Sequence, residues 1–281
     1  MKLIKGLLVF FLILTIIMTI VSGTQEKETS GSAPLINSSL EPLTVSCDYT
    51  REDLLEGLTA YDTEDGYITD SIIPGEPSVF TEKGVSKIEY YVYDSDNKCG
   101  RYKREVAFND YSSPTVGLSS PLVFYVRDAS NGDIVYRLYG RDRLDGDVKH
   151  ILIDSSDIDY DKAGDYVTSV SLTNSFGDTA TYELPVHIIK KTFSGMEIRL
   201  NENLIYIKSD TQFDPEVYVK EVEFSQTEEL VPQRDWGIDI ESNVDTSEAG
   251  IYEVRYMIQK NKDEVYGNAS GVTWLTVIVT D

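Results

Sequence analysis

The chain has 281 residues, of which 41% are hydrophobic and 11% aromatic, so it can bury substantial cores and is not globally disordered. Its 25 basic residues against 48 acidic ones give a net charge of −23, which repels phosphate backbones and anionic lipid headgroups. Nucleic acid is therefore not expected as a partner. An acidic surface also keeps an exported protein soluble, so the charge alone identifies no ligand.

Residues 1–23 are predicted to be a signal peptide or a signal anchor. Lys2 and Lys5 precede an apolar run over residues 7–21, and two small residues follow it. The run is at the upper limit for a secretory signal and slightly short for a membrane span, so cleavage and retention both remain open. In either case residues 24–281 are expected on the extracellular side of the cytoplasmic membrane, anchored or secreted.

Two regions of different composition follow the apolar run. Residues 24–42 are rich in Ser, Thr, Glu and Pro, which predicts a flexible tether. From residue 43 onward, apolar residues alternate with period two over short stretches such as 87–93 and 166–172, which predicts half-buried strands. Turn signals separate these stretches, and only residues 50–58 suggest a helical turn.

An internal repeat predicts the domain organisation. The Asp-Gly pairs at residues 65–66 and 145–146 lie 80 residues apart, and each is followed by another Gly after 18 residues. A third, partial copy matches the second at an offset of 86 residues. The predicted domains are 43–110, 111–191 and 192–281, the last a diverged copy without the Asp-Gly pair. The residues that define the repeat are Gly66, Gly84, Gly146, Gly164, Tyr166, Gly250 and Tyr252.

The first copy resembles bacterial Ig-like repeats. The resemblance is carried by residues 60–69 with their Asp-Gly pair and Thr, by Gly84, and by the strand-like run 88–94 with its Asp/Asn turn. It covers most of the first two domains and only the Gly250 half of the third. It implies an all-β fold of three tandem Ig-like antiparallel β-sandwiches, a module type found in surface and secreted bacterial proteins, including insecticidal crystal toxins.

A Gly-x-Tyr pattern extends this resemblance. Tyr166 and Tyr252 each follow a repeat-defining Gly by two residues, in a place similar to the tyrosine corner of Ig folds. In that corner, a Tyr hydroxyl ties a loop to the sandwich. The first domain has Ser86 at the corresponding place, so the pattern predicts corners in the second and third domains only.

Cys47 and Cys99 are the two cysteines of the chain, and both fall in the predicted first domain. An exported pair is typical of a disulfide. Cys47 falls in the first predicted strand and Cys99 near the start of the last, and these strands are neighbours in Ig-type sandwiches. A disulfide that pins this sheet edge is therefore predicted, with two free thiols as the alternative.

Two acidic clusters are candidates for calcium. Asp62, Glu64 and Asp65 share one predicted turn, and the linker pair Asn109 and Asp110 resembles the junction at which tandem cadherin repeats hold calcium. The alternating ligand spacing of a dedicated calcium loop is missing, so ordinary turn and linker chemistry is the favoured interpretation. No other metal and no cofactor is expected.

Catalysis is not expected. His150 and His187 both lie in strand-like runs, and no Ser or Cys stands in a nucleophile motif. The predicted function is a non-catalytic spacer and protein-interaction surface of the adhesion type, held to the membrane through the N-terminal segment alone. An exported hydrolase is a remote alternative.

A string of carbohydrate-binding modules is the closer alternative. Six tyrosines suggest a platform for sugar stacking, although strand alternation sends Tyr90 to the opposite face from Tyr91 and Tyr93. The expected partner is thus a protein or a glycan at the cell exterior. The tyrosines of this candidate platform are Tyr61, Tyr67, Tyr90, Tyr91, Tyr93 and Tyr102.

Overall fold

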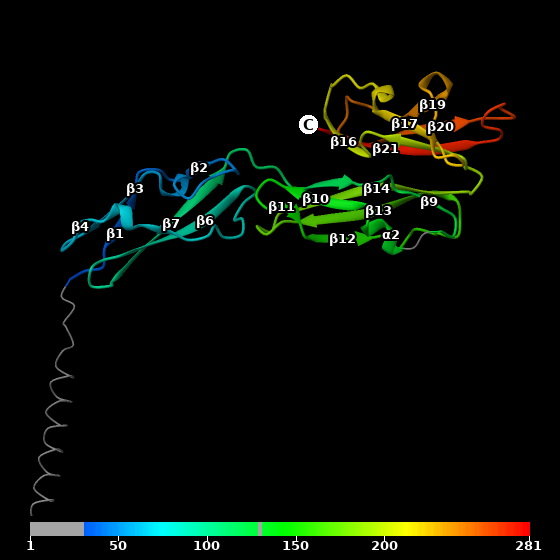
Figure 1. Cartoon of the computed structure of the whole chain (residues 1–281). Coiled ribbons are helices and arrows are strands. Elements are labelled where there is room, and N and C mark those ends of the chain that lie inside the picture. The colour runs from blue at the N-terminus through cyan, green and yellow to red at the C-terminus, as the bar shows by residue number, and fades with distance from the viewer. Residues whose placement is uncertain (1–30, 129–130) are drawn as a thin grey trace, which may run out of the picture. The chain divides into compact units, whose positions relative to one another are not determined.

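The computed structural model describes residues 31–128 and 131–281, so the predicted export segment lies outside the described residues. Within them the fold is β-structure apart from one short helix, α2 (Asn131–Val135), and single 3₁₀ turns (Figure 1). One of these turns spans Asp53–Leu55, inside the stretch where a helical turn was predicted. The all-β fold class is confirmed. None of the described helices is long and apolar enough to cross a membrane.

The chain forms two compact units. Unit 1 holds the described residues up to 45 together with 49–77 and 87–107. Unit 2 holds 46–48, 78–86 and 108–281. The described strands form three sandwiches, of which the first belongs largely to unit 1 and the second and third to unit 2.

The first sandwich has a three-stranded and a four-stranded sheet. The three-stranded sheet has the order β1 (Leu35–Ser38), β3 (Leu58–Asp62), β4 (Gly66–Tyr67). The four-stranded sheet has the order β2 (Leu43–Val45), β7 (Cys99–Phe108), β6 (Val85–Tyr93), β5 (Ile73–Pro74).

The second and third sandwiches repeat this plan. In the second, the sheets are β8 (Thr115–Leu118), β10 (Leu138–Asp142), β11 (Gly146–Val148) and β9 (Val123–Tyr125), β14 (Thr179–Ile189), β13 (Gly164–Thr173), β12 (His150–Asp154). In the third, they are β15 (Met196–Leu200), β17 (Val219–Phe224), β18 (Glu229–Leu230) and β16 (Leu204–Lys208), β21 (Ser270–Thr280), β20 (Gly250–Gln259), β19 (Ile238–Ser242).

The strand order is the same in all three sandwiches. The third therefore keeps the complete topology of the other two, although its sequence retains only part of the repeat. In the second and third sandwiches the strand pairs are antiparallel, except that β9 runs parallel to β14 and β16 parallel to β21. The predicted antiparallel sandwiches are thus present, with one parallel strand pair in the second and one in the third, where the second strand of the copy pairs with its last strand.

The predicted tether was too long. Residues 35–38 form β1, which pairs with β3 over four residues and buries Ile36. Ile36 is flanked by a single exposed Leu and by polar residues, so its burial left almost no periodic signal in the sequence. Part of the segment 24–42 therefore belongs to the first sandwich.

Candidate functional site

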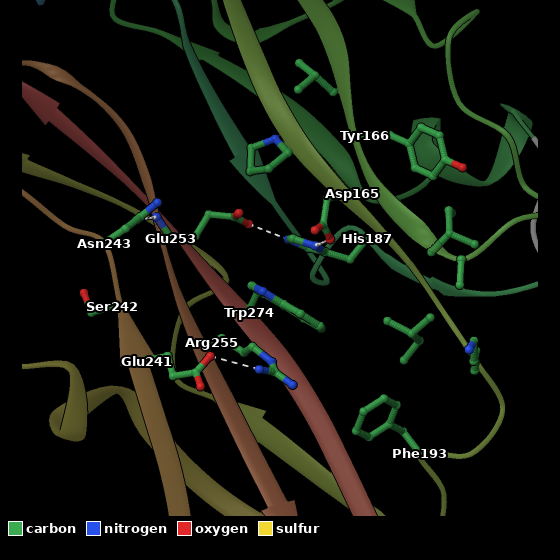
Figure 2. A pocket seen from close by; sticks show the side chains of 16 residues that line it. Asp165, Tyr166, His187, Phe193, Glu241, Ser242, Asn243, Glu253, Arg255 and Trp274 are labelled. Atoms are coloured by element: carbon green, nitrogen blue, oxygen red, sulfur yellow. Dashed lines mark hydrogen bonds and ion pairs between the residues drawn. The ribbon is translucent and has the colours of Figure 1, made fainter.

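An open groove of about 870 Å³ lies between the second and third sandwiches, both within unit 2 (Figure 2). A groove of this size that combines aromatic and charged side chains is the usual starting point in a search for a functional site. Strands β13 and β14 supply one wall, and β19, β20 and β21 supply the other.

His187 in β14 connects the two walls. Its Nδ1 lies 2.8 Å from a carboxylate oxygen of Asp165, its register partner in β13. Its Nε2 lies 2.7 Å from a carboxylate oxygen of Glu253, which is in β20 of the third sandwich. The imidazole side chain is only 7% exposed. Figure 2 shows the ring held between the two acids.

A row of side chains across the third sandwich supports this ring. Trp274 stacks on His187 with a centroid distance of 4.0 Å and an interplanar angle of 13°. Arg255, the register partner of Trp274, places its guanidinium 5.9 Å from the centroid of the Trp274 ring. Glu241 in turn accepts a hydrogen bond of 2.9 Å from Arg255. The His187 ring is thereby fixed on one face as well as at both nitrogens.

The electrostatic balance favours the imidazolium form. Burial by itself lowers the pKa of His187, but the hydrogen bonds and charges of Glu253 and then of Asp165 outweigh it, so the pKa lies above its usual value. A protonated ring donates at both nitrogens, which matches the two carboxylate partners. The arrangement is thus a hydrogen-bonded clamp between sandwiches, in which both ring nitrogens are already engaged.

Sequence reasoning placed His187 correctly in a strand but missed its partners. Glu253 lies 66 residues further along the chain, and Trp274 reaches the ring from a third strand. No local pattern signals a contact between side chains of two different sandwiches. His150, the other histidine, lies exposed in β12.

The first calcium candidate is a turn with its own hydrogen bonds. Asp62 is buried, and its Oδ1 accepts the backbone N–H groups of Glu64 at 2.8 Å and Asp65 at 3.0 Å. These bonds hold the pKa of Asp62 below its usual value. Asp65 in turn accepts from the backbone and hydroxyl of Ser95. Asp142, Asp145 and Ser175 repeat this network in the second sandwich.

The second calcium candidate is also engaged. Asp110 accepts the backbone N–H of Cys47 at 2.8 Å and pairs with Arg143 at 2.9 Å, while Asn109 is exposed in the linker. Across residues 31–128 and 131–281 there is no group of three or more His, Cys, Asp or Glu able to hold a metal ion. At both places carboxylates serve as turn or linker acceptors, and the calcium hypothesis stays a prediction.

The predicted disulfide is absent, and both cysteines are free. The expected strand adjacency is present, since β2 and β7 are neighbours. However, Cys47 bonds to Asp110, just beyond the C-terminal end of β7, whereas Cys99 is the first residue of that strand. A ten-residue strand is roughly 30 Å long, far beyond the reach of about 7 Å that a disulfide allows between Cα atoms.

The two predicted tyrosine corners are present. The hydroxyl of Tyr166 donates to the carbonyl of Lys162 at 3.0 Å, and that of Tyr252 donates to the carbonyl of Glu248 at 3.0 Å. A Cβ at Gly250 would lie 3.1 Å from the Tyr252 ring, a tight contact, whereas one at Gly164 would lie at an ordinary 3.4 Å from the Tyr166 ring. In the first repeat Ser86 instead donates to the carbonyl of Ser78.

The six tyrosines of the candidate sugar platform do not form one surface. Tyr90 is fully buried and its hydroxyl donates to the carbonyl of Leu54. Tyr91 and Tyr102 donate to the carboxylates of neighbouring glutamates, and Tyr93 is half exposed in β6. Tyr61 and Tyr67 lie together on the three-stranded sheet, with ring centroids 5.3 Å apart. The predicted platform is therefore reduced to this pair.

Comparison with known proteins finds one distant sequence relative of note. No family model matches the chain. It is similar to the pesticidal crystal protein Cry22Aa of Bacillus thuringiensis, with 28% identity over 206 residues that make up 72% of this chain and 27% of the relative. The chain thus spans about a quarter of the length of that protein. The relative is a crystal protein, in keeping with the predicted resemblance, while the Ig-like type of the repeats stays a prediction.

Comparison with solved structures finds matches of low identity and low TM-score. The M60 catalytic domain with the CBM51-1 and CBM51-2 domains from Clostridium perfringens ZmpB is 13% identical, with a TM-score of 0.24 over 90% of this chain and 31% of the other. The protocadherin gamma B2 cadherin domains 3–6 are 11% identical, with a TM-score of 0.20 over 88% and 73%. TM-scores this low establish no common arrangement of domains.

Proposed function

We propose that the chain is an exported, non-catalytic protein whose sandwiches act as a spacer and as an interaction surface of the adhesion type. The observation that carries the spacer role is the His187 clamp. It places a buried imidazole ring of the second sandwich between its own Asp165 and Glu253 of the third. Such a contact is favourable only while all partners stay in place, so it opposes independent motion of the two sandwiches.

Further contacts at the same junction support this role. The hydroxyl of Tyr206 in β16 accepts the backbone N–H of Val116 and donates to its carbonyl, both at 3.0 Å. Leu204 and Ile278 of the third sandwich are buried in the hydrophobic cluster of the second. Polar and apolar contacts thus join the two sandwiches into one body, as a spacer requires.

Nuclear magnetic resonance relaxation of the purified chain tests the spacer. We expect one rotational correlation time for residues 115–189 and 196–280, because the junction makes them tumble together. His187→Gln weakens the clamp and is expected to separate the two correlation times, whereas His150→Gln, an exposed change in the same sandwich, should not. Independent tumbling in the unaltered chain contradicts the spacer role.

The export part of the proposal rests on the apolar run at residues 7–21. Protease added to intact cells that produce the chain is expected to digest the sandwiches if they remain anchored, and a cleaved chain is expected in the medium. Protection from the protease, together with absence from the medium, contradicts export.

A further inference from the structure

Three apolar side chains form an exposed row across the three-stranded sheet of the first sandwich. The strand register places Leu35 opposite Tyr61, and Tyr61 opposite Tyr67. Their exposed fractions are 69%, 45% and 81%. The two tyrosine rings meet at an interplanar angle of 69°, so one ring stands edge-on beside the other. The two rings therefore lie side by side on the surface without stacking face to face.

The second sandwich shows that the fold does not need this row. The positions 80 residues later are Thr115, Arg141 and Asp147, and the strand register aligns them in the same way. Arg141 and Asp147 form an ion pair across the strands. The same place in the same topology is therefore polar in one copy and aromatic in the other. Exposed aromatic rings that the sheet does not require indicate a binding surface.

The neighbouring row on the same face is polar and uncharged. Asn37 and Thr59 are register partners and both are exposed. On the other side of the aromatic row, the turn between β3 and β4 carries Glu64 and Asp65, also exposed. The surface thus combines aromatic rings with amide, hydroxyl and carboxylate groups. These polar groups can form hydrogen bonds with the hydroxyls of a ligand.

We propose that this row binds an uncharged glycan. The apolar faces of sugar rings pack on Tyr61 and Tyr67, and sugar hydroxyls bond to Asn37 and Thr59. The acidic turn and the net charge of −23 disfavour an anionic ligand. The proposal deepens the interaction role given above by naming the class of partner, and it rests on that role.

The size of the row favours a glycan over a protein. A tyrosine offers at most about 250 Å² of surface, so two partly exposed rings and one Leu fall well short of the roughly 800 Å² per partner that a stable protein interface buries. A short stretch of sugar rings fits a surface of this size.

The test uses the purified full chain on an array of neutral oligosaccharides of glucose, galactose, mannose and N-acetylglucosamine, with sialylated and sulfated counterparts. Hits are measured by calorimetry. The decisive variant, Leu35→Thr with Tyr61→Arg and Tyr67→Asp, installs the residues that the second sandwich holds at these positions. Tyr136→Ala is the matched control, because Tyr136 is 83% exposed in the second sandwich, outside the row.

We expect binding to neutral sugars, at least a tenfold loss of affinity in the triple variant, and a change below twofold in Tyr136→Ala. Tyr67→Ala, a milder change at an exposed site, is expected to weaken binding in the same direction and serves if the triple variant unfolds. An array without neutral hits, a preference for charged sugars, or unchanged affinity in a folded variant overturns the glycan site. None of these outcomes affects the relaxation test of the spacer.

Discussion

The first two sandwiches differ at one buried position of equivalent strands. This position is Arg104 in β7 of the first sandwich and, 80 residues later, Leu184 in β14 of the second. Leu184 belongs to an apolar cluster. Arg104 instead donates to the carbonyls of Leu54 at 2.6 Å and Glu56 at 2.7 Å, and to the hydroxyl of Tyr90 at 2.9 Å. One topology thus accommodates a charged core position in one copy and an aliphatic one in the next.

The buried Arg104 needs hydrogen-bond acceptors from a nearby loop, whereas the buried Leu184 does not. The guanidinium is tolerated because the segment with the 3₁₀ turn Asp53–Leu55 turns its carbonyls inward, and because the Tyr90 ring lies 5.1 Å from it. A buried charge without such acceptors would be strongly unfavourable. The strand order is therefore common to the two copies, whereas the residue at this core position and its contacts with the preceding loop differ.

The largest effect is expected from Arg104→Leu, which copies the residue of the second sandwich. The carbonyls of Leu54 and Glu56 lose a donor in a buried place, so the free energy of unfolding of the first sandwich should fall by about 3 kcal/mol. Hydrogen exchange of peptides from β6 and β7 measures this.

Arg101→Leu, an exposed change in the same strand, should leave that exchange nearly unaltered. Both tryptophans, Trp236 and Trp274, lie in the third sandwich, so their fluorescence reports whether the loss stays local. If β6 and β7 keep the same protection from hydrogen exchange in Arg104→Leu, the first sandwich tolerates the Leu of the second, and the two cores do not differ in their requirements.

The next effect is expected at His187, where the first repeat has Ala107. The pKa of His187 is raised in the folded state. The contribution of its charge to the free energy of unfolding is therefore complete below the unfolded pKa of about 6.5 and is lost as the pH rises through the folded pKa. His187→Gln should therefore cost about 2 kcal/mol at pH 6 and less at pH 9. Urea unfolding followed by tryptophan fluorescence measures both.

The exposed His150→Gln provides the control for this titration, since it removes the other histidine of the same sandwich. A loss of stability in His187→Gln that grows as the pH rises has the wrong sign for a charged clamp and indicates a neutral ring.

A smaller effect is expected from the tyrosine corners. Tyr166→Phe and Tyr252→Phe each remove one hydroxyl that holds a loop carbonyl at 3.0 Å, so the melting temperature should drop by a few degrees. Ser86→Ala tests whether the serine of the first repeat has the same role. A drop in the two tyrosine variants without one in Ser86→Ala means that the first repeat has no corner at all.

The smallest effect is expected from a reducing agent. Both thiols are free, and burial followed by the hydrogen bond and charge of Asp110 raises the pKa of Cys47 to about 12. Dithiothreitol should leave the stability of the first sandwich unchanged, and iodoacetamide at pH 8 should label Cys47 slowly. Lower stability after reduction indicates that a disulfide forms in the secreted chain.

Much of the fold could be predicted from the sequence, because period-two alternation and turn residues act locally. The Asp-Gly pairs indicated two turns correctly, since Gly66 and Gly146 adopt φ values of +75° and +70° that favour glycine. The Gly-x-Tyr pattern likewise predicted the two corners, whose donor and acceptor lie four residues apart. Such features need only neighbouring residues.

The sequence by itself thus determined the all-β class, the repeat and the local turns. Only the tertiary structure decided which side chains meet: His187 with Glu253, Tyr61 with Tyr67, and Arg104 with the carbonyl of Leu54. It also placed Cys47 and Cys99 at opposite ends of β7, although their strands are neighbours. The reason is geometric, because alternation fixes the face on which a side chain lies but not the register of its strand or the partner that reaches it from another sheet.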